Sequence, residues 1–182
     1  MFKLIKRALT LLIAAAIMTN SFGVMAGTIP QNAEVEIDQW RSQKFEELDK
    51  AHQEMVIQEL KSIGLSDKEI SSIIKLEKQV AILSSDNKSE PLRTKIGDTK
   101  TKTINISKNT LTSVGSGGIA ALLVRKGVPT AAAAMIAGGV IGLISDNVSF
   151  SSITITIKYV YGYNNDGVLA WNIGPVTWKV NY

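Results

Sequence analysis

The sequence predicts an α+β protein in which two helical hairpins precede a C-terminal antiparallel β-hairpin. Three observations support this class. The first third has apolar residues at helical spacing, and the middle has a long apolar run interrupted by glycine and proline. The end alternates apolar and polar residues over two segments. The expected order is an N-terminal α-helical hairpin, a short strand, an apolar glycine-rich helical hairpin and the β-hairpin.

The first 26 residues have the three-part layout of a secretory signal peptide. Lys3, Lys6 and Arg7 precede an apolar run over residues 8–18, and Val24 and Ala26 form a V-x-A cleavage site. The run is about half as long as the ~20 residues that span a bilayer, which disfavours an uncleaved anchor. We therefore expect cleavage after Ala26 and a secreted, extracellular product.

Removal of this segment changes the charge argument. The full chain has a formal net charge of +4, but the part from Gly27 has 17 basic and 16 acidic residues. A nucleic-acid partner is not expected, because binding to phosphates needs a surplus of Lys and Arg. The chain has no cysteine, so it has neither disulfides nor a lipoprotein anchor. Among secreted proteins this absence favours a Gram-positive bacterium as the source.

The remaining chain has two halves of opposite charge. Residues 27–93 contain 13 acidic and 9 basic residues, whereas residues 94–182 contain 3 acidic and 8 basic. We predict an acidic helical hairpin over 27–83, a polar linker over 84–98, and a basic domain over 99–182. Arg93 lies in this linker and is a candidate site of a second cleavage.

The acidic segment predicts two helices. In residues 33–63 one apolar face is expected, and Gly64 then ends the helix. Ser66 and Glu69 have the spacing of a capping box that begins a second helix, which is expected to end near Leu83. The apolar residues of the first face are Ile37, Phe45, Leu48, Met55 and Ile63.

The basic segment begins with an alternating, threonine-rich strand over 99–106 and continues with apolar helices over 111–126 and 129–144. Gly127 and Pro129 separate these helices, so Arg125 and Lys126 are expected at the tip of a hairpin. Ala134, Gly138 and Gly142 form a stripe of small residues that lets two helices approach closely. This hairpin is either the core of a small domain or a membrane-inserting element.

The C-terminal segment switches to a period of two. Residues 153, 155, 157, 159, 161 and 163 are expected on one face, a turn follows at 164–167, and a second strand returns with a break or bulge at Gly174-Pro175. Candidate contact residues are the aromatic Tyr159, Tyr161, Trp171 and Trp178. Tyr and Trp rings suit a membrane interface or stacking on sugars, although cross-strand packing over the helices is the commoner role.

No pattern for catalysis was found. His52 is the only histidine, and no nucleophile or further metal ligand is recognisable near it in the sequence. We therefore expect no enzyme, no cofactor and no bound metal.

The layout of signal, acidic helical segment and cationic glycine-rich part is similar to that of secreted bacteriocin or toxin precursors. The first hypothesis is a membrane-active antimicrobial or toxin-like protein with its active part in 94–182. The alternative is a secreted, non-enzymatic binding or structural protein that acts at a cell surface. The candidate partners are bacterial membrane lipid, another cell-surface component and a second copy of the chain.

Overall fold

The computed structural model describes residues 33–85 and 94–182, and it confirms a mixture of helices with an antiparallel sheet, the α+β class. The predicted signal peptide, its cleavage site at Ala26, and Arg93 lie outside the described residues. Gln31–Tyr182 form one compact unit.

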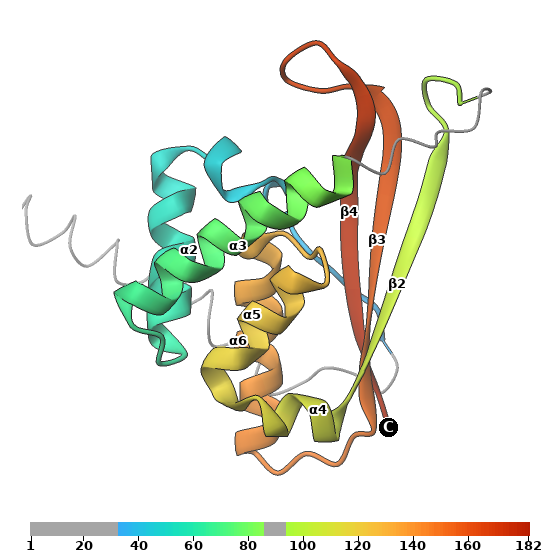
Figure 1. The fold of residues 1–182 in the computed structure, drawn as a ribbon. Helices are drawn as coiled ribbons and strands as arrows, with labels where there is room; N and C mark the ends of the chain where they lie inside the picture. The colour runs from blue at the N-terminus through green and yellow to red at the C-terminus, as the bar shows by residue number, and fades with distance from the viewer. Residues whose placement is uncertain (1–32, 86–93) are drawn as a thin grey trace, which may run out of the picture. The chain divides into compact units, whose positions relative to one another are not determined.

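The sheet has four antiparallel strands in the order β1-β4-β3-β2 (Figure 1). The short β1 (Val35–Glu36) and the edge strand β2 (Thr99–Ser107) flank the long hairpin of β3 (Ser152–Tyr163) and β4 (Leu169–Asn181). Asn164 organises the hairpin turn, since its side chain accepts hydrogen bonds from the main-chain N–H groups of Asp166 and Val168. Gly167 completes this turn with φ +73°.

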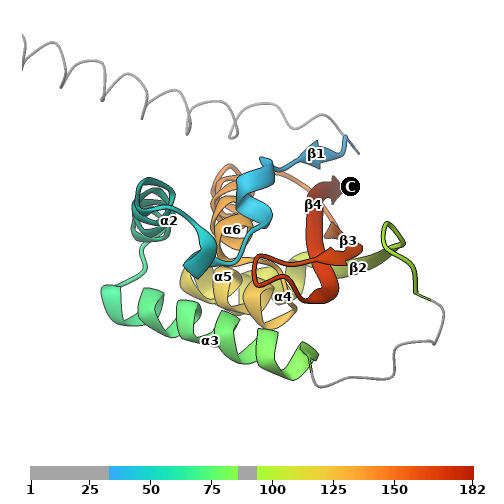
Figure 2. The ribbon, with the colours of Figure 1, turned by 90° about the horizontal axis from the view of Figure 1, so that it is seen from above.

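One side of the sheet carries the core, and the helices lie on that side (Figures 1 and 2). Ile104, Ile155 and Trp178 pair across β2, β3 and β4, and all three side chains are buried. The opposite side is polar, with Thr103, Thr156 and Thr177 paired in the same way. The predicted alternation of the β-hairpin therefore matches the observed register.

A bulge divides the long hairpin. The pairing Ile157–Val176 shifts to Tyr159–Ile173, so that Gly174 and Pro175 lie opposite the single residue Lys158. This is where the sequence predicted a break. Strand β1 pairs only with Thr177 and Trp178 of β4. Pro175 therefore has no partner on β1, and the N–H group that proline lacks is not needed for a hydrogen bond to that strand.

The apolar middle segment forms α5 (Gly115–Arg125) and α6 (Thr130–Ser145), joined by a turn in which Gly127 has φ +92°. The predicted helix over 111–126 is interrupted. Gly115 adopts φ +67°, a left-handed conformation that suits glycine, and separates the short α4 (Lys108–Ser113) from α5. Most residues of α6 are buried, so in this structure α6 is a core helix.

The acidic segment differs from its prediction at the start. The helix expected over 33–63 is wrong for its first half: β1 and two short 3₁₀ turns (η1, Gln39–Ser42; η2, Phe45–Glu47) precede α2 (Lys50–Ser62). The main chain of residues 35–37 hydrogen-bonds to β4 instead, and Asp49 caps α2 by accepting a bond from the N–H of His52. The residues before Lys50 therefore do not continue the helical spacing of α2, and the predicted apolar face does not form as one surface. Met55, which was expected on that face, is exposed.

The second helix, α3 (Asp67–Ser85), begins with the predicted capping box. The carboxylate of Glu69 accepts hydrogen bonds from both the N–H and the hydroxyl of Ser66. These bonds lower the pKa of Glu69. The start of α3 packs on α5, because a Cβ on Gly117 would lie 3.7 Å from Cγ of Leu65, just before α3, and 3.8 Å from Oε1 of Glu69. The acidic and basic halves therefore share one hydrophobic core.

Within the predicted stripe of small residues, Gly138 faces the end of α2. Ala134 is buried in the core, whereas a Cβ on Gly138 would lie 3.8 Å from Ile63 at the end of α2. The closest approach on α6 is at the neighbouring Gly139, toward Trp178 of the sheet. Two adjacent glycines thus face different partners, because consecutive helical residues are rotated by about 100°.

Candidate functional site

The helix-facing side of the sheet is covered along only part of its length. Along β3 the inward residues change from the buried Ile153, Ile155 and Ile157 to the half-buried Tyr159 and Tyr161. Tyr163, the last, is 65% exposed. Figure 1 shows the hairpin of β3 and β4 continuing past the helices. Beyond the bulge, the described residues therefore cover only part of the face that elsewhere forms the core, and we call this the uncovered end of the sheet.

Aromatic residues line this open part, which we call the aromatic strip (Tyr159, Tyr161, Trp171 and Ile173). The rings of Tyr161 and Trp171 lie on paired residues with centroids 5.3 Å apart and are tilted by 59°. Nζ of Lys100 lies 4.1 Å from the centroid of Trp171, a cation–π contact. Burial raises the pKa of Tyr159 above its ordinary value.

Exposed apolar side chains gather at the end of the strip. Of the seven large apolar side chains that the described residues expose, four lie here. Tyr163 pairs with Leu169, Val168 adjoins the turn, and Ile96 precedes Gly97, whose N–H donates to the carbonyl of Tyr161. We call this group the apolar tip (Ile96, Tyr163, Val168 and Leu169).

Three lysines lie around the start of the strip, on both faces of the sheet. Lys100 pairs with Tyr159 and Lys102 with Ile157, so both lie on the face of the strip, whereas Lys158 pairs with Thr101 and lies on the opposite face. All three are exposed, and β2, β3 and β4 contain no Asp or Glu. We call these residues the lysine band. The acids near this end, Asp98 and Asp166, lie in the flanking loops.

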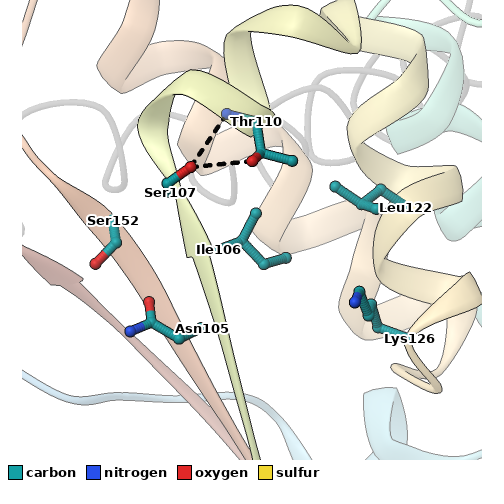
Figure 3. Close-up of a pocket in the computed structure, with 7 residues that line it drawn as sticks. All are labelled: Asn105, Ile106, Ser107, Thr110, Leu122, Lys126 and Ser152. Carbon is teal, nitrogen blue, oxygen red and sulfur yellow. Dashed lines mark hydrogen bonds between the residues drawn. The ribbon is translucent and has the colours of Figure 1, made fainter.

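The predicted hairpin tip, Arg125 and Lys126, is exposed at the junction of α5 and α6. A shallow depression of about 450 Å³ lies beside it, between α5 and the edge strand β2 (Figure 3). Lys126 is its one charged lining residue, and Ser107 and Thr110 hydrogen-bond to each other as the cap of α4. The carbonyl of Lys126 accepts a hydrogen bond from Nζ of Lys102, which brings this tip close to the lysine band.

Three buried ionisable residues were missed by the sequence analysis: Arg41, Glu59 and Glu77. Arg41 forms a bidentate pair with Glu59, with both N–O distances at 2.6 Å, and also donates to the carbonyl of Ala131 at 3.3 Å. Glu77 accepts from the N–H groups of Phe45 (2.9 Å) and Thr130 (2.7 Å).

The hydrogen bonds of Arg41 with Ala131 and of Glu77 with Thr130 link the acidic half to the first residues of α6. Burial raises the pKa of Glu77, against the lowering effect of its hydrogen bonds. The sequence held one signal for both acids: each occupies a position in the buried stripe of its helix, beside Leu60 in α2 and after Ile70 and Ile73 in α3.

The contacts of His52 are those of an ordinary packed side chain. Its Nδ1 lies 2.8 Å from the carboxylate of Asp49, and its ring packs 4.3 Å from that of Trp40. Within residues 33–85 and 94–182, no group of three or more metal-binding side chains was found. In the same residues, no helix combines the length and hydrophobicity needed to cross a membrane.

The structure brings some predicted contact residues together and separates others. Tyr159, Tyr161 and Trp171 share the aromatic strip, whereas Arg125 and Lys126 lie on the helical layer. Trp178 is 1% exposed in the core and is not available for contact, because it faces α6 on the covered part of the sheet. The sequence placed all four aromatic residues together because it held no information on where the helices stop covering the sheet.

Comparison with known proteins gave no relative: no family model, curated protein or solved structure matches the chain.

Proposed function

We propose that this chain is a secreted, non-enzymatic protein that binds a cell surface through the uncovered end of its sheet. The observation that carries the proposal is the distribution of apolar side chains. The residues of α6 are mostly buried, whereas the apolar tip and the aromatic strip are exposed or half-buried at one end of β3 and β4. Exposed apolar groups that gather at one place mark interaction surfaces.

The signal-like segment at residues 1–26 supports an extracellular location for this contact. The expected secreted product begins at Gly27. Expression of the full chain in a Gram-positive host, followed by N-terminal sequencing of protein from the medium, tests this step. A product that stays in the cells with Met1 or an internal start would contradict it.

Binding to cells tests the proposal itself. The chain from Gly27 retains the whole compact unit Gln31–Tyr182 and is suitable for the assay. We expect it to sediment with intact Gram-positive cells, and we expect Leu169→Asn to weaken this binding. Met55→Asn is the matched control, since Met55 is 44% exposed and Leu169 is 42% exposed, but Met55 lies on α2. Protein that remains in the supernatant with every cell type would refute the proposal.

A second candidate is the membrane-active, toxin-like function, with α5 and α6 as the inserting hairpin. The observation that favours it is the composition of α6, which is apolar on nearly all sides, as lipid-embedded helices are. Insertion would require α6 to leave Trp178, Arg41 and Glu77. Dye release from vesicles distinguishes the two functions, because surface binding alone leaves the bilayer intact.

A further inference from the structure

The uncovered end of the sheet carries three kinds of side chain in a definite order. Along the strands, the lysine band lies level with Ile157 to Tyr159, the aromatic strip begins at Tyr159 and continues past the band, and the apolar tip lies at the end. Charged, then aromatic, then aliphatic is also the order of groups met on entering a phospholipid bilayer from water. We infer that the partner bound by this end is the phospholipid bilayer itself, with the apolar tip inserted among the lipids. This inference rests on the proposed function.

The dimensions of the hairpin agree with shallow insertion. Strands rise about 3.4 Å per residue, so Tyr163 lies about 14 Å along β3 from Tyr159, which pairs with Lys100. Interfacial segments enter the boundary between headgroups and acyl chains by roughly 5–10 Å. The apolar tip can therefore reach the upper acyl chains while the lysine side chains extend among the phosphates.

Charge supports the same partner. The lysine band has no acidic neighbour on β2, β3 or β4, and its members form no ion pair within residues 33–85 and 94–182. Basic residues close to an anionic membrane surface strengthen binding to it. Anionic phospholipids are therefore the preferred surface.

A sugar polymer fits this end less well. The rings of Tyr161 and Trp171 are tilted by 59° rather than coplanar, so they do not form a flat platform for stacking. Three of the four residues of the apolar tip are aliphatic, and aliphatic side chains gain more from transfer into hydrocarbon than from contact with a hydrated sugar.

Vesicle sedimentation tests the inference with the chain from Gly27. The vesicles contain phosphatidylcholine alone or a mixture of phosphatidylcholine with phosphatidylglycerol. We expect tighter binding to the mixture and a roughly tenfold or greater loss of affinity in Val168→Asn/Leu169→Asn. Met55→Asn should bind as the unchanged protein does.

The lysine band is tested by changing its three members to Gln. We expect this variant to lose its preference for phosphatidylglycerol. The matched control changes Lys50, Lys68 and Lys75 to Gln; these are exposed lysines on α2 and α3, and the change in net charge is the same. The control should keep the preference. Circular dichroism and thermal unfolding confirm that each variant is folded.

Tryptophan fluorescence reports the depth. Brominated phosphatidylcholine quenches indoles in the outer acyl region, so we expect quenching that Trp171→Phe removes and Trp40→Phe leaves unchanged. Equal quenching in both variants would contradict insertion of the tip.

The outcomes separate the inference from the proposed function. Binding to cells or to purified cell wall without binding to any vesicle would overturn the lipid inference and leave the proposed function standing. Vesicle binding that Arg125→Glu/Lys126→Glu abolishes and Val168→Asn/Leu169→Asn leaves intact would also overturn it, in favour of the helical hairpin. Absence of binding to both cells and vesicles would refute the proposed function.

Discussion

Gly139 of α6 lies directly against the indole of Trp178 on β4. A Cβ at Gly139 would come within 3.0 Å of Cη2 and 3.1 Å of Cζ2 of that ring. Trp178 is fully enclosed, so the ring has little room to move away. This contact sets the distance between the central helix and the sheet.

Gly139→Ala should therefore destabilise the protein by about 1–3 kcal/mol, as overpacking does in a rigid core. Gly138→Ala is the control, because a Cβ there would make only an ordinary contact of 3.8 Å with Ile63. Alanine favours a helix over glycine by up to about 1 kcal/mol, so this control should be neutral or stabilising. Urea unfolding of the chain from Gly27 measures the stability of both variants. Equal effects of the two changes would show that the ring of Trp178 moves to make room for the added methyl group.

The buried pair of Arg41 and Glu59 predicts strong coupling. Arg41→Met leaves the carboxylate of Glu59 buried without its cation, which should cost about 3–5 kcal/mol. The double change Arg41→Met/Glu59→Leu should cost clearly less, because no charge is then left unpaired. A double-mutant cycle by urea unfolding measures the coupling. Additive effects would mean that the pair does not act as a unit.

Glu77 predicts a pH dependence with a definite sign. Burial raises its pKa in the folded protein above the ordinary value of 4.5, so the folded state binds this proton more tightly than the unfolded state. Its contribution to stability is fully present below pH 4.5 and decreases as the pH rises through the folded pKa. Glu77→Gln does not titrate, so the unchanged protein should lose stability relative to this variant as the pH rises. Urea unfolding at several pH values checks this, and the opposite trend would indicate that the two N–H bonds outweigh burial.

Cleavage between the halves should not separate them. Lys95 is exposed, and Arg93 lies just before it in the predicted linker, so limited trypsin treatment should cut there first. The contacts of Leu65 with α5 and of Glu77 with α6 should then hold the two pieces together. Size-exclusion chromatography should show a single peak that contains both pieces. Separate peaks at neutral pH would instead support two independent parts.

Local patterns were sufficient for many elements. The capping box at Ser66 and Glu69, the stop at Gly127 and the turn at 164–167 depend on residues close in sequence, so each was predictable. The alternation of β3 was equally clear, because one side of a half-buried strand must be apolar over its whole length. The α+β class followed from these periods.

Only the tertiary structure decided the rest. Residues 35–37 pair with β4 rather than extending a helix, because distant backbone hydrogen bonds outweigh a weak local preference. The close glycine is Gly139 and not Gly138, since the rotation of α6 against the sheet depends on packing. The sequence by itself determined that Tyr159, Tyr161 and Tyr163 share the face of Ile153. That the helices leave these residues open while covering Trp178 depends on how far the helical layer reaches along the sheet, a relation between elements that no local period encodes.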